Sequence, residues 1–293
     1  MTASFIQSSV EKILCPVCES STITRKFNKN DCWICTCESC GHMFADVKAD
    51  LSHTKAVYSD EYFEGGKDGY PDYFLEKNLL IKRGEGYGKV VNKYMKPGYM
   101  LDVGAAAGFL LKGFHNTGWQ GVGVEPNAKM AKFGQTEMKL DIINSPVELF
   151  RSEKKFDLVT MIQVLPHFFD LKKGLQVLAD HTKPGGYWLI ETWNRESLTA
   201  KITKESWHEY SPPSVLHWFS PESLTDVGKK MGFSFVAKGR KIKYINTTHA
   251  KTLLSHSIQS SIVKKLVATL VPGNITLPYP SEDLFWILLK KDA

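Results

Sequence analysis

The sequence predicts an α/β protein in which a doubly wound parallel sheet follows a small cysteine-rich domain. Apolar strands and amphipathic helices alternate from about residue 98 onward, as in doubly wound folds. A loop of Gly and Ala follows the first of these strands. All six cysteines lie between Cys15 and Cys40. Ligands of such sheets bind at the carboxyl ends of the strands, so we expect the functional groups there.

Composition and charge are those of a soluble globular chain with one main and one small domain. The chain has 293 residues, of which 43% are hydrophobic and 23% charged. Its net charge of +6 is spread without a block of like charges, so no nucleic-acid partner is expected. The sequence has no apolar run long enough for a bilayer and no secretion signal at its start, and we expect a cytoplasmic location.

Two C-x-x-C motifs, CPVC and CESC, stand about 18 residues apart, which is the spacing of a zinc ribbon. Four thiolates close a tetrahedral site without room for water, so the metal is expected to be structural. Cys32 and Cys35 compete for the second pair of ligand positions, but the intact C-x-x-C-G turn ending at Gly41 favours the later pair. The predicted ligands of Zn²⁺ are Cys15, Cys18, Cys37 and Cys40.

We assign residues 1–50 to this ribbon and 51–97 to a helical lead-in or cap. Apolar residues recur at helical intervals over 74–95, with an interruption near the glycines of 84–88, which predicts one or two helices. The aromatic residues of 58–73 are expected to pack on the domain as a linker. The alternative is that they roof the cofactor pocket.

The stretch 100–111, MLDVGAAAGFLL, predicts a strand, a small-residue loop and a helix that together bind a nucleotide-type cofactor. The dinucleotide fingerprint G-x-G-x-x-G needs a third glycine where Phe109 stands. The pattern D-x-G-x-G-x-G instead fits Asp102 and Gly104 through Gly108, with Ala106 in place of the middle glycine. The loop therefore favours S-adenosylmethionine over NAD.

The strands that follow end in further candidate ligands. A short strand, 121–125, ends in Glu125 about 20 residues after the first glycine, where a carboxylate can accept bonds from both ribose hydroxyls. We predict a helix at 128–136, strands at 140–143, 156–163 and 187–192, and a helix at 171–181. The predicted cofactor-binding residues are Asp102, Gly104, Ala105, Ala106, Gly108, Glu125, Pro126, Ser145 and Gln163.

The segment 207–221 is rich in groups that bind or deprotonate a methyl acceptor. His167, at the end of the fourth strand, and His217 are the candidate bases, and Tyr210 is a third candidate catalytic residue. We place His217 slightly ahead, although a packed core histidine competes evenly with this assignment. Ser220 and Pro221 begin a helix that ends near 231, and strand 233–237 follows.

Residues 246–280 are interpreted as a helical insertion before the final strand, 283–290, of a domain that spans 98–293. Apolar residues at four-residue steps over 254–270 predict an amphipathic helix. Packing on the domain or over the acceptor pocket is the expected role. The alternative is peripheral contact of 250–270 with a membrane surface or a lipid-linked substrate.

The segments LDVGAAAGFLL, VGVEPN, FDLVTMIQVLPH and TKPGGYWLIETWN, in this order, resemble the class I S-adenosylmethionine-dependent methyltransferases. With CPVC and CESCG before them and SPPSVLHWFSPESL after, the chain is similar to the bacterial subfamily related to ubiquinone and sugar methyltransferases that carries a zinc ribbon. The resemblance implies a Rossmann-like sheet of seven strands. It also places the glycine loop under the methionine part of the cofactor and Glu125 on the ribose.

We therefore expect transfer of a methyl group from S-adenosylmethionine to an O, N or C nucleophile of a small molecule, sugar or lipid-linked intermediate. An RNA methyltransferase whose ribbon grips nucleic acid, and a non-catalytic cofactor-binding scaffold, are the alternatives. Two residues depart from the family pattern. Ala106 replaces a glycine, and Pro166 stands where the family usually has Glu before the residue that corresponds to His167.

Overall fold

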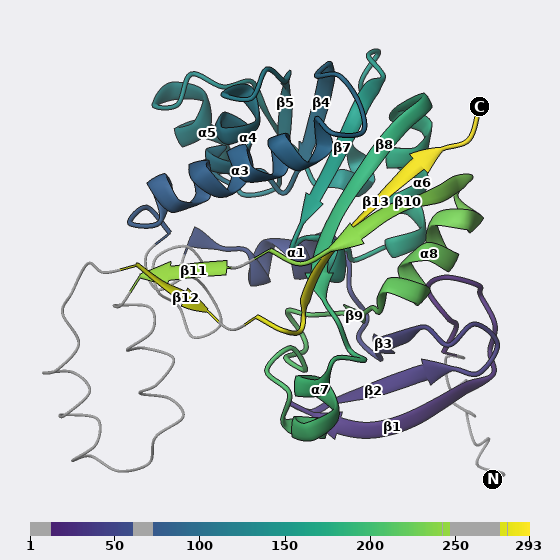
Figure 1. The fold of residues 1–293 in the computed structure, drawn as a ribbon. Coiled ribbons are helices and arrows are strands. Elements are labelled where there is room, and N and C mark those ends of the chain that lie inside the picture. Colours follow the sequence, from purple (N-terminus) through teal and green to yellow (C-terminus); the bar gives the residue numbers. More distant parts are fainter. Residues whose placement is uncertain (1–12, 61–72, 242, 247–275, 280) are drawn as a thin grey trace, which may run out of the picture.

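The computed structural model describes residues 13–60, 73–241, 243–246, 276–279 and 281–293. Its centre is a seven-stranded sheet in the order β10-β13-β8-β7-β4-β5-β6 (Figure 1). Strands β4 to β8 pair in parallel, and β13 is antiparallel to both of its neighbours. The strands are β4 (Tyr99–Val103), β5 (Gln120–Glu125), β6 (Ile142–Asn144), β7 (Phe156–Ile162), β8 (Thr182–Trp193), β10 (Phe233–Gly239) and β13 (Leu284–Lys291). The predicted seven-stranded Rossmann-like fold is confirmed.

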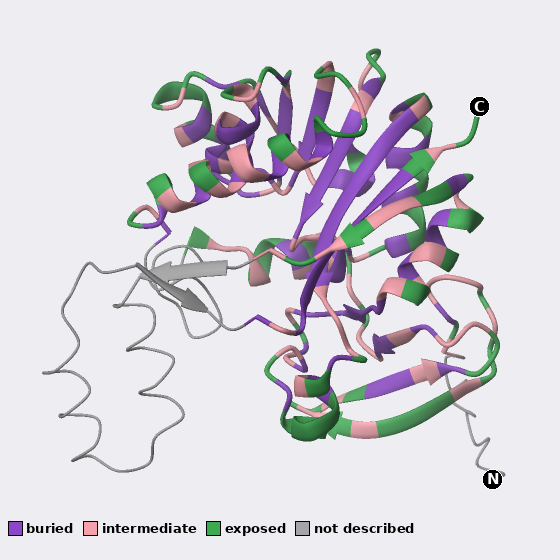
Figure 2. Ribbon diagram, in the orientation of Figure 1, coloured by how far each residue is buried: buried purple, intermediate pink, exposed green. Residues whose placement is uncertain are grey.

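Helices cover both faces of this sheet because successive strand residues alternate between the faces. Leu101, Val159 and Ile190 join one buried cluster with α6 (Leu171–His181) and α8 (Pro221–Lys230). Met100 and Leu189 join a second cluster with α3 (Lys77–Val91), α4 (Phe109–His115) and α5 (Ala128–Thr136). Figure 2 shows β7 and β8 buried between the two layers.

Helix α3 runs without a break through the glycines that suggested an interruption. A Cβ on Gly84 would lie 2.3 Å from the backbone oxygen of Leu110, and a Cβ on Gly88 would lie 2.0 Å from Oγ1 of Thr117. These glycines therefore let α4 approach α3 closely, and the lower helix propensity of glycine is outweighed by packing.

Local signals placed several helices correctly. Helices α5 and α6 have the predicted bounds. Ser220 caps α8 by accepting a hydrogen bond from the backbone N–H of Ser223, while Pro221 takes the first turn. Strand β8 begins at Thr182 rather than 187, because Phe156 pairs with Thr182 and Leu158 with Tyr187, so 183–186 bulge out of the ladder.

The cysteine-rich region forms a four-stranded antiparallel sheet in the order β1-β2-β3-β9. Its members are β1 (Ile23–Lys29), β2 (Cys32–Cys37), β3 (Met43–Ala45) and β9 (His217–Trp218). The last strand comes from the predicted acceptor segment. Ile34 and Ala45 of the ribbon share one buried cluster with Trp207, Tyr210 and Trp218. The ribbon core is thus completed by the acceptor segment, separately from the two clusters that flank the central sheet.

Five short helical elements lie in the connections between the strands and longer helices of the described residues. They are α1 (Leu51–Val57), α7 (Leu198–Thr203) and the 3₁₀ turns η1 (Val147–Leu149), η2 (Leu165–His167) and η3 (Lys204–Ser206). Within the predicted linker, Tyr73 stacks on Phe109 with ring centroids 5.1 Å apart. The aromatic residues at 61–72 lie outside the described residues.

Strands β11 (Lys243–Asn246) and β12 (Thr276–Tyr279) pair antiparallel near the ends of the predicted insertion. The amphipathic helix predicted for 254–270, and with it the proposed membrane contact, lies outside the described residues. Within the part of the chain that the structure describes, no helix has the length and apolarity needed to span a membrane.

Candidate functional site

Asp102 lies near the carboxyl end of β4, where the strand order of the sheet reverses. Its side chain is 1% exposed, and its Oδ1 accepts a hydrogen bond of 2.6 Å from Oγ1 of Thr160 on β7. Its Oδ2 is buried without a partner among the described residues. Burial raises the pKa of Asp102 to about 7, although the Thr160 hydroxyl opposes this shift.

Glu125 ends the neighbouring strand β5 and faces the glycine loop. Its Oε2 accepts from the backbone N–H of Ala106 and its Oε1 from that of Asn127, both at 2.8 Å. Burial raises the pKa of Glu125 to about 7 despite these two bonds. A carboxylate oxygen has a second lone pair, so each oxygen can also accept from a hydroxyl of a bound ligand.

The small-residue loop has the backbone that the motif predicts. Gly104, Ala106 and Gly108 have φ values of +66°, +46° and +79°. A Cβ on Gly104 would meet Cγ2 of Val164 at 2.5 Å, so only glycine fits there without movement. Ala106 adopts a left-handed conformation that favours glycine, which explains why the family pattern has glycine at this position. Ala105 is buried beside it.

The remaining predicted cofactor residues lie at the carboxyl ends of neighbouring strands. The backbone N–H of Ser145, after β6, donates to the Glu125 carbonyl at 3.1 Å, and the carbonyl of Pro126 accepts from the amide of Asn144 at 3.0 Å. Gln163, after β7, has a φ of +57° and a buried Nε2 with no partner among the described residues.

Two buried polar atoms without a hydrogen-bond partner among the described residues therefore lie at this edge of the sheet. They are the acceptor Oδ2 of Asp102 and the donor Nε2 of Gln163. Buried polar atoms are normally paired, so an unpaired donor and an unpaired acceptor at one edge of the sheet indicate a place where a polar ligand binds. S-adenosylmethionine carries an amino group, a carboxylate and ribose hydroxyls, and the residues present fit these groups.

His167 lies in η2, directly beyond β7. Its Nδ1 is 2.7 Å from the carbonyl oxygen of Ser214, and because a carbonyl only accepts, Nδ1 carries the proton. The Nε2 atom then has a lone pair, and no hydrogen bond to it is found among the described residues. The ring of Tyr58 packs edge-on at 5.6 Å. Burial lowers the pKa of His167, so the imidazole is neutral near pH 7.

His217 is bonded at both ring nitrogens. Its Nε2–H donates to the carbonyl of Phe168 at 2.9 Å, so its Nδ1 accepts, at 3.3 Å, from Nε2–H of His42. The two imidazoles are 4% and 2% exposed. Burial lowers the pKa of His217 to about 4. The bonds and the pKa describe a neutral, structurally engaged imidazole.

Tyr210 lies in the cluster between the ribbon and the acceptor segment. Its ring packs edge-on against Phe27, Trp207 and Trp218, and its hydroxyl is 3.4 Å from the sulfur of Met43. Burial raises the pKa of the Tyr210 hydroxyl. These are the contacts of a core aromatic residue.

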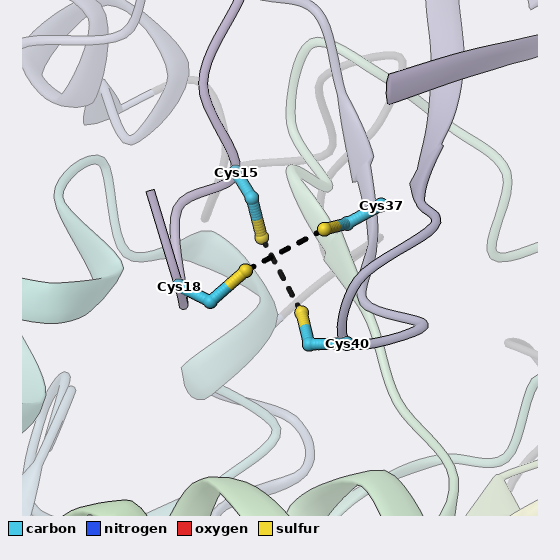
Figure 3. Close-up of side chains that lie close together, drawn as sticks. All are labelled: Cys15, Cys18, Cys37 and Cys40. Atoms are coloured by element: carbon cyan, nitrogen blue, oxygen red, sulfur yellow. Dashed lines mark hydrogen bonds between the residues drawn. The ribbon is translucent and has the colours of Figure 1, made fainter. Parts of the chain in front are cut away.

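The four predicted zinc ligands converge, as Figure 3 shows. Among the described residues the sulfur atoms of Cys15, Cys18, Cys37 and Cys40 lie within 4.8 Å of one another. The Cys15–Cys40 and Cys18–Cys37 sulfur pairs are 3.5 Å apart. A tetrahedral Zn²⁺ with bonds of about 2.3 Å needs sulfur separations of about 3.8 Å, so the cluster fits this ion. Cys32 and Cys35 lie outside it.

Several contacts at this edge were not predicted from the sequence. His42 contacts His217, and the amide of Asn127 donates to the backbone oxygen of Tyr58 and to Asp60. The Tyr58 hydroxyl donates to the carbonyl of Ser214 at 3.3 Å, so the end of α1 joins the cofactor strands to the acceptor segment. His42 stands in no motif, whereas Asn127 belongs to the VGVEPN segment and Tyr58 to the aromatic stretch 58–73, and the fold brings them together.

Comparison with known proteins adds family information to this geometry. A model of the methyltransferase domain family matches residues 82–238, more than half of the chain. A ubiquinone biosynthesis O-methyltransferase from Rhodopseudomonas palustris is 34% identical over 137 residues, which are 43% of this chain and 54% of that protein. One from Bradyrhizobium is 35% identical over 101 residues, 33% of this chain and 40% of that protein. The chain thus spans about half the length, or less, of these curated relatives.

Solved structures match over a larger share. The magnesium protoporphyrin IX methyltransferase of Synechocystis, with bound S-adenosylhomocysteine, gives a TM-score of 0.53 at 12% identity and covers 83% of this chain and 98% of that one. At such identity the likeness shows the fold.

Proposed function

Because the chain belongs to the methyltransferase domain family, we propose that it transfers the methyl group of S-adenosylmethionine to a hydroxyl group of a small or lipid-linked acceptor. The observation that carries the proposal is the position of two buried carboxyl groups, Asp102 and Glu125, at the ends of neighbouring strands where the strand order reverses. They flank a loop in which three residues have positive φ angles. The names of the curated relatives favour oxygen over nitrogen or carbon as the acceptor atom.

We assign cofactor binding to the carboxyl ends of β4, β5 and β7. In this assignment Glu125 accepts hydrogen bonds from the ribose hydroxyls of the cofactor. Asp102 and Gln163 face the methionine part of the cofactor, and the loop backbone lies beneath that part. When bound, S-adenosylmethionine supplies an electrophilic methyl group on its sulfonium. The protein aligns the acceptor in line with that bond and excludes water, and alignment alone accounts for a large part of such catalysis.

We assign the general base to His167 in place of His217. An acceptor hydroxyl must lose its proton as the methyl arrives, and an imidazole nitrogen with a free lone pair takes it. Nε2 of His167 has that lone pair, because Nδ1–H is held by Ser214. Both nitrogens of His217 are bonded, which supports a different role for it.

Calorimetry and turnover test this proposal in two steps. S-adenosylhomocysteine should bind the full chain with a micromolar dissociation constant, and NAD should not bind. Release of S-adenosylhomocysteine is then measured with a panel of catechols, phenols and sugar hydroxyls. His167→Gln should lower turnover roughly 10²- to 10⁴-fold while binding changes less than a few-fold. Absence of S-adenosylhomocysteine binding defeats the function, and full turnover in the variant defeats the base assignment alone.

A further inference from the structure

The backbone of His42 is part of the tetracysteine cluster. Its carbonyl accepts from the backbone N–H of Cys37 at 2.9 Å, and its own N–H donates to the sulfur of Cys40. A movement of either cysteine therefore moves His42.

The side chain of His42 leaves the cluster and enters the acceptor side of the site. It donates to His217, which donates in turn to the carbonyl of Phe168. The direction of both bonds is set by that carbonyl, since it only accepts. All these atoms are buried, and losing one partner would leave a polar group unsatisfied.

Backbone hydrogen bonds also connect the ribbon, the acceptor segment and η2 beside this pair of histidines. Strand β3 pairs with β9, and Ala45 donates to the carbonyl of Leu216, whose own N–H donates to the carbonyl of Pro166, each at 2.9 Å. The guanidinium of Arg195, just after β8, donates to the carbonyls of Gly41 and Trp218. The ribbon is thereby fixed to η2 and to the end of β8, with the acceptor segment between them.

We propose that the tetracysteine centre positions His167 for methyl transfer, through His42 and His217. Two contacts join His217 to the base His167. The Ser214 carbonyl that accepts from His167 lies in the same segment as His217, and His217 donates to the carbonyl of Phe168, the residue after His167. His217 is then a positioning residue, and a metal in the cluster acts on the acceptor chemistry through it. The inference rests on the proposed function.

The ring Nδ1–H proton of His167 gives a readout that needs no acceptor. Held by Ser214, it should exchange slowly with water and be visible by NMR in the Zn²⁺-loaded full chain, with His167→Gln identifying the signal. His217→Phe keeps an aromatic ring but removes both bonds. It should speed exchange of the His167 proton at least tenfold and lower turnover roughly 10- to 100-fold, as expected for a misplaced base. Zinc content and S-adenosylhomocysteine affinity should stay within twofold.

Two further variants make this result specific. His217→Gln can donate to Phe168 and accept from His42, so it should restore most of the exchange protection and turnover. His181→Phe is the matched control, because His181 also bonds a carbonyl, that of Val177, but at the end of α6. It should leave the His167 signal unchanged.

Removal of Zn²⁺ by a chelator should accelerate exchange at His167 in the wild type and add little in His217→Phe, since both changes break the same connection. Exchange at His167 within twofold of wild type in His217→Phe, or fully additive effects of metal removal, would overturn the inference. Wild-type protein that fails to bind S-adenosylhomocysteine would instead overturn the proposed function.

Discussion

Replacing Asp102 by Asn should stabilise the cofactor-free protein while weakening cofactor binding. Asp102 is buried, has one partner in the Thr160 hydroxyl, and has a pKa raised by burial to about 7 from its ordinary value of 3.8. A raised folded-state pKa means that the uncharged carboxyl favours folding below about pH 4, and that this contribution is lost as the pH rises through 7. Asn does not titrate, so the Asn variant does not lose this stability as the pH rises.

The size of the effect follows from the two pKa values. At about 1.4 kcal/mol per pH unit, the free energy of unfolding of the Asn variant should exceed that of wild type by about 2 kcal/mol at pH 5, rising to an upper bound of about 4 kcal/mol at pH 8. At low pH the two should differ least, because protonated Asp and Asn are both uncharged and each accepts from Thr160, leaving one O–H of Asp or the two N–H of Asn unpaired. The measurement is urea unfolding of both proteins from pH 5 to 8, without cofactor.

Thr160→Val is the companion variant. The Thr160 hydroxyl lowers the pKa of Asp102, so its removal should shift the pH dependence to still higher pH. Binding of S-adenosylhomocysteine, followed by calorimetry at pH 8, should weaken in Asp102→Asn. Stability curves of wild type and Asp102→Asn that stay parallel from pH 5 to 8 would show that Asp102 ionises normally, and the reasoning would be refuted.

Three further changes test the cofactor loop and the metal cluster. Glu125→Ala should weaken S-adenosylhomocysteine by about 1.5–3 kcal/mol in calorimetry, since charged hydrogen bonds to two hydroxyls are lost; unchanged affinity removes Glu125 from the site. Ala106→Gly should leave thermal stability and affinity nearly unchanged, because relief of the left-handed strain offsets the added chain entropy, whereas Ala106→Val should lower both. Metal analysis should find about one Zn²⁺ per chain, lost in Cys15→Ser and kept in Cys32→Ser; equal loss in both would contradict the ligand set.

The cofactor half of the site was predictable because each of its parts is encoded by a short continuous segment of the sequence. A strand, a loop of small residues and a helix follow one another at 100–111, and Glu125 ends the next strand. The caps of α5 and α8 are equally local, at Asn127 and Ser220. The hydrogen-bond partners were not visible, since those of Glu125 are backbone N–H groups and that of Asp102 is Thr160 on another strand.

The glycines of α3 show where local reasoning fails. Propensity alone predicts a weak helix around Gly84 and Gly88. Gly84 contacts α4 at Leu110 and Gly88 contacts Thr117 just after α4, so the reason for both glycines depends on a helix and turn that lie further along the chain. The same applies to β9, which has only His217 and Trp218 and exists because β3, at Met43 and Phe44, pairs with it.

The acceptor half is built from segments that are far apart in the sequence, which has a consequence for how substitutions act. His42, Tyr58, His167 and Ser214 come from the ribbon, the end of α1, η2 and the segment before β9. The cofactor strands bury their apolar residues in the clusters on either side of the central sheet, and the acceptor half meets one of these clusters at Val17, Phe168 and Phe219. Substitutions in the ribbon should therefore change turnover and acceptor preference while sparing cofactor affinity, whereas substitutions in the loop at 104–108 should do the reverse.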